Sequence, residues 1–395
     1  MRTLGRSSVA PSPFPGSRLG GAPAPEEWQG GLNITYHLGP GFSQPGWKLN
    51  LDVNNNNTHT TTYNVIGVIK GSVEPDRYVL LGNHIDAWIF GGLDPNSGTA
   101  AMLELSRVFT KLVKEKGNYT LRTKSAPLLY QVIYESAKKI PNPDPEETKA
   151  GRLTVYDTWA LRKPDPVESN TPLMQFIGSG SDYKGFQHNL GIPSHPRRAP
   201  IPHLYETFSL VDEIYDRGFH FHKAVTDLWG FVALRLSEPE ILPFSLGAYA
   251  TFISRASANI LEKYGDLIAS QNITMGRVKV NRKSLYGPWK SIEKLDLKNP
   301  LAVRRVNDQL MMVERAFIDT RGLPGRPDYN HIVTAPSKND AYSGTAFAGL
   351  SDTLFTLQET PDDLRPDLWV TFSRHLAAVT HALETASKVL TDDLW

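Results

Sequence analysis

The sequence predicts an α/β fold in the middle of the chain, followed by a helical region at its C-terminal end. The apolar run 78–81 consists of strand-forming residues and is closed by Gly82, as expected of a buried parallel strand. An amphipathic helical pattern follows at 98–114. Near the C-terminus, apolar residues recur at steps of three and four, namely Trp369, Phe372, Leu376, Val379, Leu383, Ala386 and Leu390.

The first part of the chain has few features of a packed core. Residues 1–31 are rich in Pro, Gly and Ser and are predicted to be disordered or poorly packed. Residues 32–62 alternate between apolar and polar types around the turn sequence at 39–41. We expect short strands and turns there.

The predicted α/β core begins with two strands, at 63–69 and 78–81, which flank a turn at 73–76. After the helix at 98–114, a second amphipathic helix is predicted at 127–140. It ends at the sequence Pro-Asn-Pro-Asp-Pro, because proline cannot continue a helix.

The remaining residues, 241–395, are predicted to be mostly helical. The apolar stripe over Trp369–Leu390 is typical of a long helix packed within its own domain. A subunit interface is the alternative interpretation of the same stripe.

Composition limits the class of protein. The chain has 395 residues, of which 40% are hydrophobic and 21% charged, enough for two or three globular domains. The net charge of +1 does not indicate nucleic-acid binding. We find no apolar run of the roughly 20 residues that span a bilayer, nor a signal-peptide core over residues 1–8. The absence of cysteine excludes disulfides, thiolate metal sites and a cysteine nucleophile.

Polar side chains follow the predicted strand 78–81. His84, Asp86 and Asp94 lie where open α/β sheets carry their chemistry, at the carboxyl end of a strand. Imidazole and carboxylate suit zinc, so His84 and Asp94 are candidate ligands and Asp86 a candidate orienting carboxylate. The alternative is a polar loop in which these residues only cap the strand end.

Several blocks give the chain a family resemblance. The segment RYVLLGNHIDAWIFGGLDPNSGTA resembles the metal-site segment of the M28 zinc peptidases, in the branch of glutamate carboxypeptidase II and the transferrin receptor. Further blocks agree in the same order, namely YNVIGVIKGSVEPDRYVLLGNH, GNYTLR, GSGSDYKGFQHNLGIPS, YETFSLVDEIYD and NDQLMMVERAFID. Together they cover most of residues 30–395.

The resemblance implies a partial M28 peptidase α/β sandwich with a helical, transferrin receptor-like dimerisation domain. It divides the chain into residues 1–62, with a remnant of a protease-associated domain, residues 63–240, the peptidase domain, and residues 241–395, the dimerisation domain. A homodimer through 241–395 is expected.

The family has two zinc ions bridged by an aspartate, with a glutamate as general base. The resemblance implies His84, Asp94 and His203 as metal ligands and Asp86 as the orienting carboxylate. The family's Glu-Glu segment has no counterpart, because Gly117 is followed directly by Asn118. Without the general base we expect little hydrolysis, and without the missing ligands at most one weakly bound zinc.

Other titratable residues are weaker candidates. Glu146 and Glu147 form a Glu-Glu pair beyond the second helix, where we expect a solvated charge pair in an exposed loop rather than a replacement for the missing segment. His220 and His222 lie on a helical stretch and are expected to be surface or packing residues.

The resemblance also implies a pocket for an acidic peptide, in which cations and hydrogen-bond donors face carboxylates. The matching positions are Arg122, Gly180, Ser181, Arg198 and Tyr342. Ala341 and Pro202 replace a lysine and a tyrosine of the family's pocket, which weakens the expectation of a C-terminal glutamate preference. Ordinary surface arginines are the alternative for Arg122 and Arg198.

Three hypotheses remain open from the sequence. The chain is a zinc carboxypeptidase or dipeptidase by descent with impaired activity, a non-enzymatic receptor-like or dimerising scaffold, or a shortened form produced by splicing or a faulty gene model. The family is made of type II membrane ectodomains, and the sequons at Asn33, Asn56, Asn118 and Asn272 permit glycosylation on the secretory route.

Overall fold

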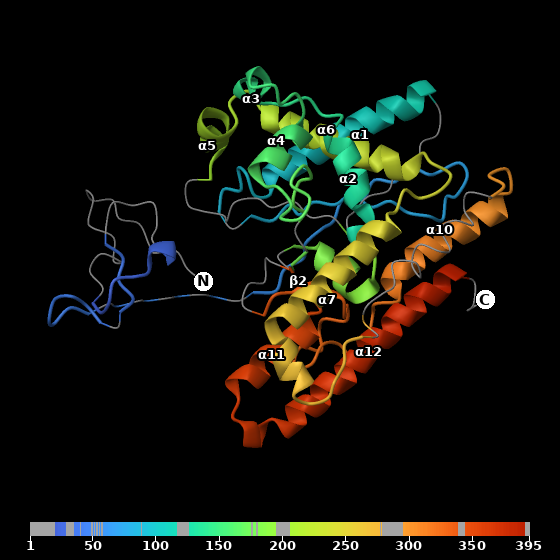
Figure 1. The fold of residues 1–395 in the computed structure, drawn as a ribbon. Coiled ribbons are helices and arrows are strands. Elements are labelled where there is room, and N and C mark those ends of the chain that lie inside the picture. Colours follow the sequence, from blue (N-terminus) through green and yellow to red (C-terminus); the bar gives the residue numbers. More distant parts are fainter. Residues whose placement is uncertain are drawn as a thin grey trace. The chain divides into compact units, whose positions relative to one another are not determined.

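Helices account for most of the secondary structure in the computed structural model (Figure 1). The structure describes residues 20–28, 35–39, 41–48, 50, 52, 54, 56, 58–87, 89–116, 126–174, 177–178, 181–194, 206–276, 278, 295–338 and 344–391. The chain forms two units, Met1–Gly67 and Val68–Trp395. Among the helices in these ranges, none is both long enough and apolar enough to cross a bilayer.

In its described residues, the first unit contains short backbone pairings and the 3-10 turn η2 (Glu26–Trp28). Pro23 pairs with His37 in an antiparallel bridge, and Gly21 pairs with Gly39. Gly21 has φ +84, and a Cβ there would lie 2.0 Å from the Gly39 carbonyl oxygen. Only glycine therefore fits this crossing.

In the second unit, the helix predicted at 98–114 is α1 (Asn96–Lys116). It packs against α6 (His220–Ser237), which also packs against α2 (Tyr130–Ala137). A 3-10 turn, η3 (Pro127–Leu129), leads directly into α2. The prediction of a helix over 127–140 is thus confirmed in type, although its last residues leave the helix before the proline-rich breaker.

Short helices connect these elements. Asp144 accepts a hydrogen bond from the Glu146 backbone amide and caps α3. Thr154 and Asp157 form a reciprocal capping box at α4. The short elements are α3 (Pro145–Lys149), α4 (Val155–Arg162), η4 (Gly185–Asn189), α5 (Phe208–Leu210), η5 (Val211–Tyr215) and η6 (Asp362–Leu364).

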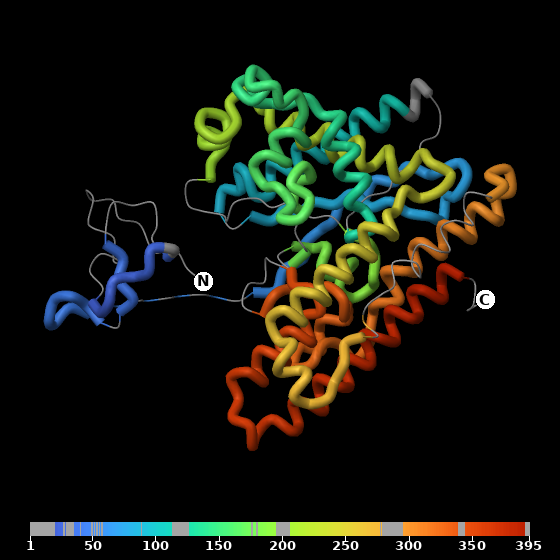
Figure 2. Tube along the Cα trace, viewed as in Figure 1, coloured from blue at the N-terminus to red at the C-terminus, as the bar shows by residue number. Residues whose placement is uncertain are grey.

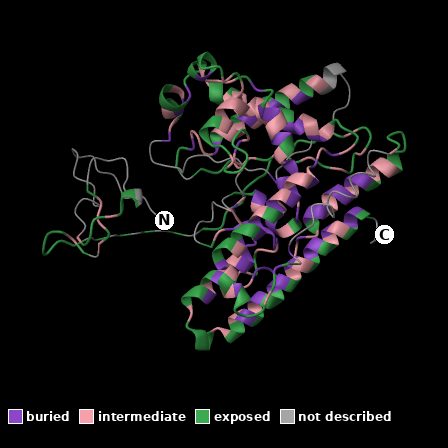
Figure 3. Cartoon of the chain, viewed as in Figure 1, coloured by how far each residue is buried: buried purple, intermediate pink, exposed green. Residues whose placement is uncertain are grey.

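The helical C-terminal prediction is confirmed. In the described part of this region, helices pack around the main hydrophobic core, namely α7 (Leu246–Ala269), α10 (Pro300–Arg315), α11 (Ala348–Glu359) and α12 (Pro366–Thr391). The stripe residues of α12 are all buried, and in Figure 3 the buried residues gather where α7, α10 and α12 face one another. This supports packing within the domain as the role of the stripe.

A buried polar network joins this core to the 181–194 segment. Glu314 on α10 is fully buried and accepts hydrogen bonds from Gln187 Nε2 at 2.6 Å and from His331 Nε2 at 3.0 Å. The Nδ1 atom of His331 accepts from the Thr334 backbone amide at 3.0 Å, so the ring proton lies on Nε2. Paired in this way, the Glu314 carboxylate can remain inside the core.

The main prediction that the structure corrects is the α/β sheet. Residues 63–69 and 78–81 run as extended chain but form no strand, and the sheet found in the described ranges is β1 (Thr334–Pro336) paired antiparallel with β2 (Gly344–Ala346). Figure 2 lets the reader follow this extended chain into α1. Tyr78 and Ile85 are largely exposed, because a strand buries its side chains only when neighbouring strands and a covering layer are present.

The turn predicted at 73–76 is present, with the Arg77 amide donating to the Glu74 carbonyl at 3.1 Å. Two ion pairs tie the turn to α10. Arg77 lies 2.6 Å from Asp308, and Arg304 binds Asp76 through both terminal nitrogens. The extended segment is therefore attached to the helical core by charged contacts.

Candidate functional site

His84, Asp86 and Asp94 come together in the structure. The Nδ1 atom of His84 lies 3.2 Å from Asp86 Oδ1, and its Nε2 atom lies 2.8 Å from Asp94 Oδ1. His84 and Asp94 are partly buried, whereas Asp86 is almost fully exposed. Each ring nitrogen thus faces a carboxylate, which is the arrangement expected of a histidine oriented by one acid and facing another.

These carboxylates change the protonation of the imidazole. Partial burial by itself disfavours the charged ring, but the hydrogen bond to Asp86 and the charge of Asp94 outweigh it. The pKa of His84 is therefore raised above its usual value of 6.5.

The Asn83 side chain helps to hold the loop around Asp94 in place. The Asn83 side chain donates to the Pro95 carbonyl at 3.1 Å and to Thr99 Oγ1 at 2.9 Å. A Cβ at Gly98 would lie 2.2 Å from Asn83 Oδ1, so glycine there lets Asn83 approach the first turn of α1. The Asp94–Pro95 peptide bond is cis.

Glu206 fixes the other side of this loop. Its backbone carbonyl accepts from the Gly92 amide at 2.9 Å, and its side chain accepts from the Asp94 amide at 2.8 Å. A Cβ at Gly92 would lie 2.7 Å from the Thr207 backbone, which only glycine avoids. Residues far apart in sequence, 91–94 and 206–207, are thereby held together.

Sequence reasoning did not assign roles to Asn83 and Glu206. Glu206 stands in the Tyr-Glu-Thr block, and Asn83 directly precedes His84, so both were visible as polar residues next to candidate ligands. Glu206 contacts Asp94 across 112 residues, and the contacts of Asn83 depend on the geometry of the loop. A local sequence pattern reveals neither.

The donor set in the described ranges is too small for a catalytic zinc site. Such a site takes three protein ligands, and His84 and Asp94 supply two donors. No group of three His, Cys, Asp or Glu side chains suited to a metal occurs among the residues that the structure describes. His84 and Asp94 therefore do not form a complete zinc site with their described neighbours.

Most of the other expected site residues lie outside the described residues, namely Arg122, Gly180, Arg198, His203 and Tyr342. Ser181 is described and its side chain is exposed. Its backbone carbonyl accepts from the Lys184 amide at 3.1 Å, at the start of a helical turn.

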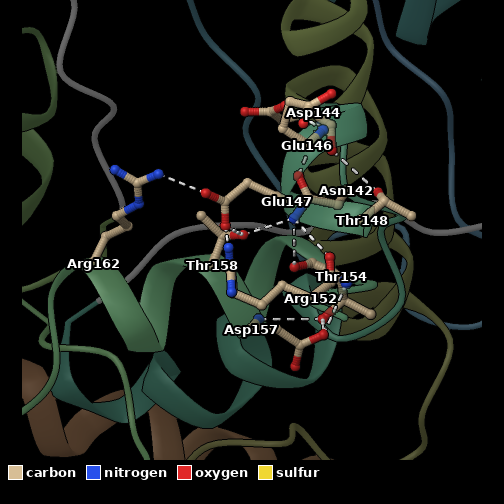
Figure 4. Close-up of polar contacts among 10 residues, drawn as sticks. All are labelled: Asn142, Asp144, Glu146, Glu147, Thr148, Arg152, Thr154, Asp157, Thr158 and Arg162. Atoms are coloured by element: carbon tan, nitrogen blue, oxygen red, sulfur yellow. Dashed lines mark hydrogen bonds and ion pairs between the residues drawn. The ribbon is translucent and has the colours of Figure 1, made fainter. Parts of the chain in front are cut away.

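The Glu-Glu pair at 146–147 is only partly as expected (Figure 4). Glu146 is exposed, in agreement with a solvated charge, but the prediction for Glu147 is wrong, because its side chain is buried. Glu147 binds Arg152, Arg162 at 2.5 Å and Thr158 at 2.8 Å. Hydrogen bonds from Arg152 first, then from Arg162 and Thr158, lower its pKa to about 2. Glu147 is thus a structural anion that joins α3 to α4.

Comparison with known families defines the class of protein. Residues 64–123 match peptidase family M28, and residues 275–391 match the transferrin receptor-like dimerisation domain. The chain therefore contains an M28 peptidase segment and a transferrin receptor-like dimerisation domain, as the resemblance implied.

The curated relatives narrow the class further. The chain is 32% identical to aminopeptidase NAALADL1 of Rattus norvegicus over 94% of its own length and 59% of that protein's. It is 31% identical to probable glutamate carboxypeptidase LAMP1 of Arabidopsis thaliana, over 91% of the chain and 58% of that protein. It is 29% identical to the glutamate carboxypeptidase 2 homolog of Caenorhabditis elegans, over 88% and 56%.

The chain is thus similar to these three proteins and spans less than two thirds of the length of each. The alignment with NAALADL1 has 448 positions, more than the 395 residues of this chain. The relative therefore carries residues within the aligned region that have no counterpart here.

Proposed function

We propose that this chain is an impaired M28-type carboxypeptidase or dipeptidase that retains peptide binding but hydrolyses peptides poorly. The observation that carries the proposal is the His84 imidazole held between Asp86 and Asp94, with no third metal donor beside His84 and Asp94 among the residues that the structure describes. An orienting acid, an imidazole and a second acid are half of a dinuclear hydrolytic centre.

We propose the following roles. His84 and Asp94, with His203, are the remaining metal ligands, and Asp86 orients His84. The substrate-binding positions are Arg122, Gly180, Ser181, Arg198 and Tyr342.

The impairment follows from the chemistry. General-base catalysis contributes roughly 10²- to 10⁴-fold to such reactions, and this chain lacks the family's Glu-Glu segment after α1. A second metal that clamps both the attacking and the leaving oxygen needs ligands of its own. Neither Glu146, in solvent, nor Glu147, bound to two arginines, provides a free base beside His84.

A direct test is zinc-supplemented turnover of acetylated acidic dipeptides by the purified chain, together with metal analysis. We expect little hydrolysis and at most one weakly held zinc per chain. Zinc-dependent turnover that disappears in His84→Ala, or two tightly held zinc ions, would contradict the proposed impairment. The variant His381→Ala is the matched control, because it removes an imidazole at an exposed position outside the candidate site.

A second candidate is a non-enzymatic dimerising scaffold, favoured by the family match over 275–391. We propose a domain plan of residues 1–62, 63–240 and 241–395, with a homodimer formed through the last part. Sedimentation of the purified chain should give a dimer mass; a monomer at micromolar concentration would argue against the scaffold.

The cellular location is likewise a proposal. The family resemblance supports an extracellular, glycosylated protein, with glycans at sequons such as Asn272. Mass spectrometry of the protein secreted from eukaryotic cells, before and after glycosidase treatment, should show a mass loss.

A further inference from the structure

A cavity lies between α1 and α6, next to the candidate site. Its volume is about 570 Å³, within the range of small-ligand sites. One wall comes from α1, including Leu105 and Phe109, and the opposite wall comes from α6, including Phe231 and Leu234. Phe208 closes a third side.

The lining is mostly apolar, and the charged side chains in it are already compensated. Glu104 pairs with Arg107 at 2.6 Å, and Lys223 pairs with Asp227 at 2.5 Å. Each of these charges in the described lining therefore has a partner of opposite sign, and the remaining lining is mostly apolar, which favours an uncharged ligand.

The one histidine of the lining is compensated as well. His222 Nδ1 lies 2.6 Å from Asp216, which also accepts hydrogen bonds from the Phe221 and His222 backbone amides. Burial raises the pKa of Asp216, but the hydrogen bonds from His222 and these amides outweigh it and leave the pKa below its usual value. Asp216 therefore remains ionised beside the imidazole. The expectation that His222 is a packing or surface residue fits this position.

The cavity and the candidate site share one loop. Gly92, Asn96 and Ser97 line the cavity, and Asp94 lies between them in the chain. Glu206 fixes this loop by binding the amides of Gly92 and Asp94. A peptide lying along the loop beside Asp94 would therefore have the cavity within reach of one side chain.

We propose that the cavity between α1 and α6 binds an uncharged apolar side chain, aromatic or branched, of a peptide held at the loop that carries Asp94. The inference rests on the proposed function, in which the chain still binds peptides. It adds which kind of peptide the chain binds. The residue of the peptide that enters the cavity between α1 and α6 would thus be apolar rather than acidic.

The test compares three acetylated tripeptides that have a free C-terminal carboxylate and differ only in the central residue, acetyl-Gly-Phe-Gly, acetyl-Gly-Ala-Gly and acetyl-Gly-Glu-Gly. Binding to the purified full chain is measured by calorimetry. Burying a phenylalanine side chain should make the Phe peptide bind about 10- to 100-fold more tightly than the Ala peptide, with the Glu peptide weakest.

Two variants on α1 localise the effect. Ala100 is exposed but lines the cavity, so Ala100→Trp should fill it and remove the preference for Phe. Leu103 is exposed on the same helix and is absent from the lining, so Leu103→Trp should keep the preference. If Ala100→Trp does not fold, Phe231→Asp places a charge at the cavity and should have the same effect.

The outcomes separate the two proposals. Equal binding of the three peptides, weakened by His84→Ala, would overturn the cavity inference and leave peptide binding intact. If no peptide binds, the proposed function fails, and acetyl-phenylalanine-amide then tests the cavity alone. Binding of that amide, lost in Ala100→Trp, would support the cavity, whereas no binding would overturn it.

Discussion

Glu147 shows how a single buried acid can organise a segment. Its carboxylate is shared by Arg152, which follows α3, and by Thr158 and Arg162 on α4, so that two short helices depend on one charge (Figure 4). Removing one partner of a buried ion pair leaves the other charges unpaired, which destabilises more than the pair itself stabilises.

We predict that Glu147→Gln lowers the urea midpoint of unfolding and speeds proteolysis within 140–165, because both arginines lose their counter-charge. Glu146→Gln is the matched control, since Glu146 is exposed and contacts only Lys149 by an ion pair. Its midpoint should equal that of the unmodified chain. Equal midpoints for both variants would show that the Glu147 network is not needed for stability.

Two buried histidines make stability depend on pH. Burial lowers the pKa of His188 and of His375 from 6.5 to about 4, because the charged ring is poorly solvated in the core. Between pH 4 and 6.5 the unfolded chain binds more protons at these positions than the folded chain. Stability from these residues is therefore complete above pH 6.5 and is lost as the pH falls toward 4.

The expected loss is roughly 3 kcal/mol for each histidine between pH 7 and pH 4. Urea unfolding at several pH values measures it. His375→Gln should reduce the slope of stability against pH, even if the variant is less stable throughout. His381→Gln, at an exposed position on the same helix, is the control, and a slope unchanged in His375→Gln would refute the assignment.

At the scale of elements, α12 carries much of the C-terminal core. Its stripe packs on α10 and α11, and Phe372 is completely buried against Trp369 with a ring-centroid distance of 5.7 Å. The helix was predictable from sequence because apolar residues at steps of three and four specify one buried face, whatever its partners are.

We predict that Phe372→Ala destabilises the chain by about 3–5 kcal/mol, the usual range for removing a buried aromatic ring. Val370→Ala, on the exposed face of the same helix, should change stability by less than about 0.5 kcal/mol. Thermal unfolding of both variants checks this. A similar loss in both would mean that the exposed face is also covered, for example by a second subunit.

The extended segments behave differently from the helices. The apolar runs 63–69 and 78–81 have strand composition, yet neither forms a strand in the structure. A helix satisfies its backbone hydrogen bonds internally, whereas a strand needs a neighbour, and no composition rule supplies one. This is why the helices could be predicted from local sequence and the sheet could not.

At the scale of the whole molecule, protection from proteolysis should differ along the chain. Tyr78 and Phe90 are well exposed in extended chain, whereas Phe317 and Phe372 are fully buried in the helical core. Chymotrypsin should therefore cut first in the part of the chain before α1, after exposed residues such as Tyr63, Tyr78 or Phe90, and leave a fragment containing residues 295–391. Mass spectrometry of early digests measures the order, and initial cleavage inside α10 or α12 would contradict the fold.

The sequence by itself determined the helices α1 and α2, the helical character of the C-terminal region, the buried face of α12, the family resemblance and the placing of His84, Asp86 and Asp94 in one loop, because these depend on short spacings. Only the tertiary structure decided what surrounds that loop. Glu206 reaches Asp94 across 112 residues, Glu147 leaves solvent for two arginines, and α1 meets α6 around an apolar cavity. Such contacts are made by residues distant in the chain, so their energies appear only when the helices pack together.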